Sequence, residues 1–168
     1  MDDLLKVLVT FILIITVYAP IATFIHELGH AFVALFNTNK EINIKLGKGT
    51  RSLNMTLGRI KVMIYPFSGW SGITYVEHFK NLNYKIIFYL SGPIFSIVLS
   101  LTCYKLLDMT SNMYILNYSL KQIMVCSLLQ FLLTIIPMRY NNFTGGGYAT
   151  KSDGLRIMEL YLDKKRKH

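Results

Sequence analysis

The sequence predicts a mainly α-helical, polytopic membrane protein: a core of three transmembrane helices with a small β-hairpin or sheet between the first and second spans. The 168 residues are 52% hydrophobic. Three runs carry no charge, and each approaches the ~20 residues that a helix needs to cross ~30 Å of hydrocarbon. These runs are residues 7–25, 86–104 and 122–138. Because the buried helices of a soluble protein seldom stay uncharged over such lengths, we interpret residues 1–168 as one membrane domain.

The first span is expected over about residues 5–36. At ~1.5 Å per residue such a helix would be about 50 Å long, which exceeds the thickness of a bilayer. Pro20 lacks a backbone N–H and therefore predicts a kink or break within the helix. The sequence Asn37-Thr38-Asn39 is expected to end it.

A β-rich loop is expected over residues 41–76. Ile42, Ile44 and Leu46 alternate with polar residues, which is the periodicity of a strand. Residues 59–65 and 71–76 are two further strand candidates, and glycines separate the candidates from one another.

The second span is expected over about residues 84–107 and the third over about 113–137. Ser91-Gly92-Pro93 lies about one third of the way into the second span. Residues 152–168 are expected to hold an Asp-Gly pair, a short amphipathic helix near 155–162 and a basic tail.

The net charge is +9. The basic residues are distributed as in a membrane protein and not as in a nucleic-acid-binding protein. Basic residues gather between the first and second spans and after the third, whereas the 108–113 connection has none. The positive-inside rule then places the N-terminus outside and the C-terminus in the cytoplasm. Frequent Lys, Ile, Asn and Tyr favour a bacterial cell membrane. The basic tail either contacts anionic lipid headgroups or is solvated.

The residues with the clearest chemistry are His26-Glu27-Leu28-Gly29-His30, inside the first span. In a helix, His26 and His30 lie one above the other on one face, so both imidazoles can bind one Zn²⁺. Glu27 is rotated from them and can act as general acid and base on a zinc-bound water, whose pKa the metal lowers to about 7. The alternative is that these side chains only form hydrogen bonds with other helices. However, ionisable groups in an apolar span are functional by default.

A catalytic zinc site needs a third protein ligand. The candidates are Glu77, His78, Asp108 and Asp153, and also His168 in the basic tail. Asp108 lies on the opposite side of the membrane in the predicted topology. Physical reasoning from the residues does not separate His78 from Asp153.

Several motifs together resemble the site-2 protease family of intramembrane zinc metalloproteases, peptidase family M50, over about residues 5–160. They are His26-Glu27-Leu28-Gly29-His30, the Gly-rich turn Pro66-Phe67-Ser68-Gly69-Trp70-Ser71-Gly72, Ser91-Gly92-Pro93, and Pro137 followed by Asp153-Gly154. The resemblance implies that His26, His30 and Asp153 hold one Zn²⁺ per chain and that Glu27 is the acid/base. It also implies that the scissile segment of a substrate unwinds and pairs as a strand beside the hairpin, since a helical peptide bond hides its carbonyl.

Two features depart from the family pattern. Thr134 stands where the family usually has an Asn that steadies the substrate, and the interval from Pro137 to Asp153 is long. Asn141 or Asn142 in this interval could replace the missing Asn, and the interval could form a flap over the site. The candidate substrate-binding residues are therefore Gly69, Trp70, Ser71, Thr134, Asn141 and Asn142.

Three functions are compatible with these observations. The first is an intramembrane zinc endopeptidase that cuts a transmembrane or membrane-anchored peptide near the cytoplasmic face. The second is another membrane zincin, which would take its third ligand from Glu41, Glu77 or Glu159. The third is a catalytically silent membrane binder, against which the intact Glu27 argues. The expected partners are a membrane-embedded peptide or protein, the lipid bilayer, and either a second copy of the chain or a regulatory membrane protein.

Overall fold

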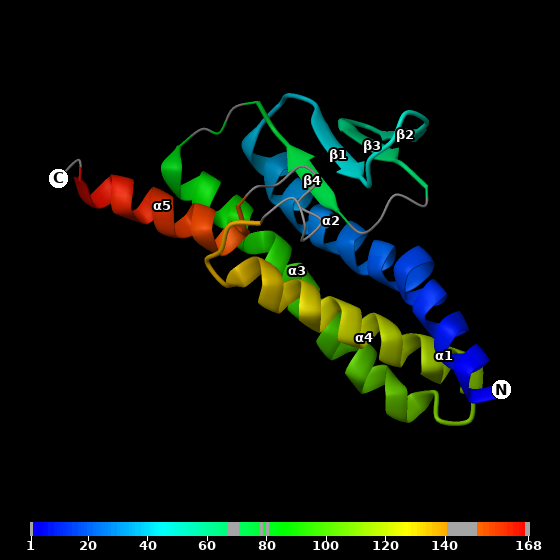
Figure 1. Ribbon diagram of the computed structural model, residues 1–168. Coiled ribbons are helices and arrows are strands. Elements are labelled where there is room, and N and C mark those ends of the chain that lie inside the picture. Colours follow the sequence, from blue (N-terminus) through cyan, green and yellow to red (C-terminus); the bar gives the residue numbers. More distant parts are fainter. Residues whose placement is uncertain (1, 67–70, 78, 80, 141–150, 167–168) are drawn as a thin grey trace.

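The computed structural model describes residues 2–66, 71–77, 79, 81–140 and 151–166. It is mainly helical, and a four-stranded sheet lies against one helix (Figure 1). Three helical segments in this part of the chain are long and apolar enough to cross a membrane, at Asp3–Asn37, Leu82–Met109 and Tyr114–Ile135. The fold class predicted from the sequence is thus confirmed.

The first span consists of α1 (Asp2–Leu13), a π-helical turn η1 (Ile14–Tyr18) and α2 (Ala19–Asn37). The irregularity predicted at Pro20 falls in the turn just before it. Pro20 cannot donate the hydrogen bond that would continue an α-helix, and the N–H of Ala19 instead donates to the Ile14 carbonyl, five residues back. The side chains of α1 and α2 therefore do not follow one continuous α-helical repeat.

Helices α3 (Leu82–Met109) and α4 (Tyr114–Ile135) form the second and third spans. The Asn81 side chain caps α3 by accepting a hydrogen bond of 3.0 Å from the N–H of Tyr84. Small buried residues on α3, Ser96, Ser100 and Cys103, lie along one side of this helix. They allow close approach of neighbouring helices, and the Ser100 hydroxyl donates to the Met124 carbonyl of α4 at 3.1 Å.

The sheet has the strand order β2-β3-β1-β4, with strands at Ile42–Leu46 (β1), Leu53–Leu57 (β2), Ile60–Ile64 (β3) and Gly72–Tyr75 (β4). β1 pairs parallel with β3 and antiparallel with β4, and β2 pairs antiparallel with β3. Three of the strands were predicted. β2 was not, although Leu53, Met55 and Leu57 alternate with polar residues. It is an edge strand with every residue exposed, and the tight β2–β3 turn uses Gly58 at φ 58°.

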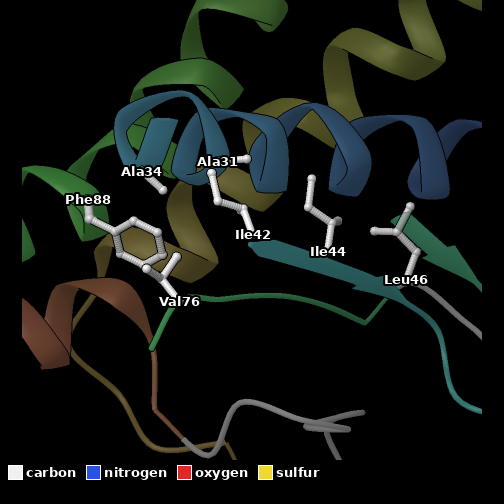
Figure 2. Packing of buried hydrophobic residues seen from close by; sticks show 7 residues of the cluster. All are labelled: Ala31, Ala34, Ile42, Ile44, Leu46, Val76 and Phe88. Carbon is white, nitrogen blue, oxygen red and sulfur yellow. The ribbon is translucent and has the colours of Figure 1, made fainter. Parts of the chain in front are cut away.

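The sheet and α2 share an apolar core (Figure 2). Its members are Ala31, Ala34, Ile42, Ile44, Leu46, Val76 and Phe88. Ala31 and Ala34 have no exposed surface, and their small side chains let β1 lie directly on the helix. Arg59, in the β2–β3 turn, donates to the Leu35 carbonyl at 2.9 Å and also to the Thr38 carbonyl, so the hairpin caps the C-terminal end of α2.

Helix α5 (Asp153–Arg166) packs on α3 and α4. It is longer than the predicted 155–162 helix, because it begins at Asp153 and takes in most of the basic tail. In Figure 1 it lies at the end of the helical bundle opposite the N-terminus.

Candidate metal centre

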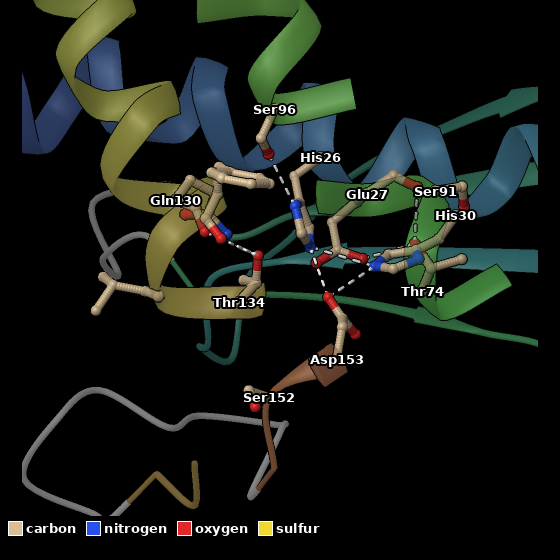
Figure 3. A network of polar contacts seen from close by, with 12 residues as sticks. His26, Glu27, His30, Thr74, Ser91, Ser96, Gln130, Thr134, Ser152 and Asp153 are labelled. Carbon is tan, nitrogen blue, oxygen red and sulfur yellow. Dashed lines mark hydrogen bonds and ion pairs between the residues drawn. The ribbon is translucent and has the colours of Figure 1, made fainter. Parts of the chain in front are cut away.

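His26 and His30 lie one turn apart on α2, and both are buried. The Nδ1 atom of His26 is 2.9 Å from the Ser96 hydroxyl, and Nδ1 of His30 is 2.6 Å from the Phe88 carbonyl oxygen (Figure 3). Because a carbonyl only accepts, Nδ1 of His30 is the donor in this contact, and its Nε2 is turned toward the cluster. The two partners on α3 thus orient both rings so that their Nε2 atoms, 3.2 Å apart, face one point.

Asp153 completes the cluster from the first residue of α5. Its Oδ2 atom lies 3.1 Å from Nε2 of His26 and 3.4 Å from Nε2 of His30. Ligand atoms around a tetrahedral Zn²⁺ at about 2.0–2.1 Å stand about 3.3 Å from one another. The spacing of the three atoms, two imidazole nitrogens and a carboxylate oxygen, therefore fits zinc. Within the described residues, this is the one group of three His, Cys, Asp or Glu side chains that could hold a metal ion.

Contacts between the end of α4 and the start of α5 place Asp153. The Ser152 hydroxyl accepts from the N–H groups of Leu155 (3.1 Å) and Met138 (3.0 Å) and donates to the Ile136 carbonyl at 2.8 Å. It therefore caps α5 and joins it to the chain that follows α4. At Gly154 an added Cβ would collide with the Ile135 carbonyl oxygen, so α5 approaches α4 this closely only with glycine.

The Asp153 carboxyl is ionised. Burial alone would raise its pKa, but the neighbouring His30 and His26 outweigh burial and hold this pKa below its usual range. Burial and the nearby Asp153 carboxylate raise the pKa of Tyr140 to about 12, so this phenol is neutral. The Tyr140 hydroxyl donates to the Leu133 carbonyl at 2.9 Å.

A sequence model described as peptidase family M50 matches residues 10–160. The chain belongs to peptidase family M50. The resemblance to the site-2 proteases is thereby confirmed, and members of this family are intramembrane metalloproteases that in general depend on zinc. No curated protein matches the chain.

Glu27, the acid/base expected from the sequence, is buried beside the two histidines in this M50 protein. The Thr74 hydroxyl, on β4, lies 2.7 Å from Oε2 of Glu27 and 3.0 Å from the Glu27 carbonyl oxygen. A Cβ at Gly72 would stand 2.6 Å from Oε1 of Glu27. Because residues 72 and 74 face the same side of a strand, β4 presents both a hydrogen bond and an open space to this carboxylate.

Gly29 and Gly92 leave space for the helices and imidazole rings around the site. At Gly92 an added Cβ would stand 2.5 Å from Cε1 of His30 and 2.8 Å from Cε1 of His26. At Gly29 it would stand 2.6 Å from the Ser91 carbonyl oxygen. Gly29 therefore lets α2 and α3 meet, and Gly92 leaves the volume that the imidazoles occupy.

A cavity of about 470 Å³ contains the cluster. His26, Glu27, His30 and Asp153 line it, together with the whole of β4 and one side of α4. Of the candidate substrate-binding residues, Ser71 and Thr134 line the cavity. The Thr134 hydroxyl donates to the Gln130 carbonyl one turn earlier at 2.8 Å, so it is committed to its own helix. Gly69, Trp70, Asn141, Asn142, His78 and His168 lie outside the described residues.

The other carboxylates considered as ligands do not belong to the group of three that could hold a metal ion. Glu41 pairs with Lys61 at 2.8 Å, and Glu159 pairs with Lys151 at 2.8 Å. Glu77 lines the cavity as an exposed residue beyond β4, and Asp108 is near the end of α3 far from Phe88.

Sequence reasoning missed the supporting contacts. Thr74 was part of a predicted strand, and its alternation with Gly72 could have marked the face turned to α2. Ser96 stands one helical turn after Gly92, so the spacing of small residues on α3 was a usable signal. The Phe88 carbonyl has no signal in the sequence, because any residue supplies a carbonyl.

Proposed function

We propose that this M50 protein is a zinc endopeptidase that hydrolyses a peptide bond in a transmembrane or membrane-anchored substrate. The observation that carries the proposal is the convergence of three ligand atoms, on His26, His30 and Asp153, beside the buried carboxylate of Glu27 in one cavity.

We assign the zinc ligands to Nε2 of His26, Nε2 of His30 and the Asp153 carboxylate. A zinc ion supplies two things to such a hydrolysis, an activated water and polarisation of the scissile carbonyl. Glu27 accepts the proton of the attacking water at its carboxylate and returns it to the nitrogen of the leaving amine. Thr74 and Gly72 support this role because they set the position of the carboxylate while leaving Oε1 uncovered by a side chain.

Strand β4 is the proposed substrate platform. It is an edge strand of the described sheet, paired with β1 on one side, and all of its residues line the cavity. A substrate segment that unwinds and adds to this edge gains main-chain hydrogen bonds and exposes its carbonyl to attack. Ser71, just before β4, is retained as a candidate contact, as are Gly69 and Trp70.

The distribution of basic residues supports a proposal for the side of the membrane on which cleavage occurs. Under the positive-inside rule, the end of the bundle that carries the sheet and α5 faces the cytoplasm, so we propose cleavage near the cytoplasmic face of a bacterial cell membrane.

The test is the Glu27→Gln variant, purified in detergent and given reconstituted membrane peptides. It should retain zinc, because Glu27 is not a ligand, and should lose cleavage by a factor of about 10² or more. Cleavage at the rate of the unaltered protein would refute the proposed mechanism. Full retention of zinc by the Asp153→Ala variant would refute the proposed ligand set.

A further inference from the structure

Two positively charged side chains line the same cavity as the metal centre and come from different elements. Lys85 lies near the start of α3, and Arg156 lies in the first turns of α5; both are half-buried. Within the described part of the chain, neither forms an ion pair. Cations that are partly removed from water without a counter-ion are costly, so this arrangement indicates a site for an anion.

Tyr89 contacts one of the two cations and shares a helical face with the other. Nη1 of Arg156 donates to the Tyr89 hydroxyl at 3.3 Å, and the guanidinium carbon is 5.3 Å from the centre of the Tyr89 ring. Lys85 precedes Tyr89 by four residues on α3, so it lies on the same face of that helix. The three residues therefore form one cluster, which we call the basic cluster.

No carboxylate among the described residues forms an ion pair with the basic cluster, although Arg156 helps to lower the pKa of the Glu159 carboxyl, three residues later on α5. Lys151 also lines the cavity, but both carboxylate oxygens of Glu159 lie 2.8 Å from its Nζ atom. The cavity's own carboxylates have other partners, since Glu27 lies against Thr74 and Asp153 against the histidines. Glu77 is exposed, and the structure shows no ion pair between it and either cation.

Each cation of the basic cluster stands one helical turn from a residue that forms or supports the proposed metal centre. Lys85 is three residues before Phe88, whose carbonyl orients His30, and Arg156 is three residues after Asp153. One turn spans about 5.4 Å, and an extended peptide advances about 3.3 Å per residue. A substrate residue about two or three positions from the scissile bond can therefore place its side chain in the cluster.

Building on the proposed peptidase function, we propose that Lys85 and Arg156 bind the carboxylate of a substrate Asp or Glu about two or three residues from the scissile bond. A carboxylate matches the planar fork of a guanidinium, and the cluster lies inside the cavity of the metal centre. The fork also matches a phosphate, so it is the place of the cluster inside the cavity of the metal centre that favours a peptide carboxylate over a lipid phosphate.

The test measures binding to the non-cleaving Glu27→Gln protein. The probes are fluorescent transmembrane peptides that differ only by Glu or Gln at one position, scanned along both sides of the scissile bond. At the matching position the Glu peptide should bind on the order of tenfold more tightly, which corresponds to about 1.4 kcal/mol. Lys85→Met and Arg156→Met should each reduce this preference. Lys85→Arg should retain it, and so should Lys165→Met, which removes an exposed cation from the same helix as Arg156.

Equal affinity for Glu and Gln peptides at every position would overturn the proposal, and so would a preference that survives in the Lys85→Met/Arg156→Met double variant. Repeating the assay in phosphatidylcholine vesicles with and without phosphatidylglycerol tests the lipid alternative. If the substitutions weaken only the binding to anionic vesicles, the cluster holds a headgroup and the proposal is wrong. If the protein with Glu27 intact cleaves none of the peptides, the peptidase function fails, whatever the binding preference.

Discussion

The Thr74 hydroxyl lies 2.7 Å from the Glu27 carboxylate and joins the edge strand of the sheet to the proposed acid/base. Thr74 is buried, and its hydroxyl also lies 3.0 Å from the carbonyl oxygen of Glu27. The strand that would receive the substrate is therefore the strand that orients the carboxylate.

Replacing Thr74 with Val removes this hydroxyl while nearly preserving volume. Hydrogen bonds to charged groups contribute about 1.5–3 kcal/mol, so we expect kcat to fall by about tenfold or more with zinc content unchanged. Steady-state cleavage and metal analysis check this, and Thr74→Ser, which keeps the hydroxyl, should stay near the original rate. A Val variant as active as the original protein would show that the contact does not position Glu27.

The Gly92→Ala variant should bind zinc poorly, because the added methyl group would overlap both imidazole rings. Overpacking of this kind costs about 1–3 kcal/mol, so the dissociation constant for zinc should rise by about tenfold or more. Competition with a chromogenic chelator measures it. Ser91→Ala, next to it on α3, removes a hydroxyl that donates to the Phe88 carbonyl and should bind zinc normally. Equal affinity in both variants would contradict the packing argument.

Asp153→Asn should lose most bound zinc, because a neutral amide is a far weaker ligand than the carboxylate that faces both histidines. The matched control is Asp163→Asn, an exposed position on the same helix, which should bind one zinc per chain. Inductively coupled plasma mass spectrometry gives the metal content of both. One zinc per chain in the Asp153→Asn protein would move the third ligand to another residue, with His78 as the first alternative.

Arg59→Ala should destabilise the junction between the hairpin and α2. It removes donors to two carbonyls at the C-terminal end of α2, and the expected loss is about 1–2 kcal/mol. Thermal unfolding in detergent should show a lower Tm. Arg51→Ala, at an exposed position in the connection between β1 and β2, should leave Tm unchanged. Equal Tm values for the two variants would mean that the cap contributes little to stability.

Much of the architecture could be predicted because lipid is a simple solvent. Long uncharged runs can only be helices there, which is why the expected spans at 84–107 and 113–137 lie within two residues of α3 and α4 at every end. Strand β2 escaped prediction because it is exposed along its whole length and shows no burial on either face. The π-helical form of the turn before Pro20 was not predicted either. A proline shows that one N–H donor is missing, but it does not show which donors the neighbouring carbonyls will use instead.

By itself the sequence determined that this is a three-span membrane protein with a two-histidine metal motif and a neighbouring carboxylate inside the first span. Residues four apart on a helix must share a face, so that much follows from local geometry. The sequence left the third ligand open between His78 and Asp153 until the family resemblance favoured the latter. Only the tertiary structure decided that Asp153 lies 3.1 Å from His26, that the Thr74 hydroxyl contacts Glu27 and that Arg156 contacts Tyr89. The reason is physical, because these contacts join residues that lie between 47 and 127 positions apart in the sequence. The packing of whole helices and strands sets the distances between such residues.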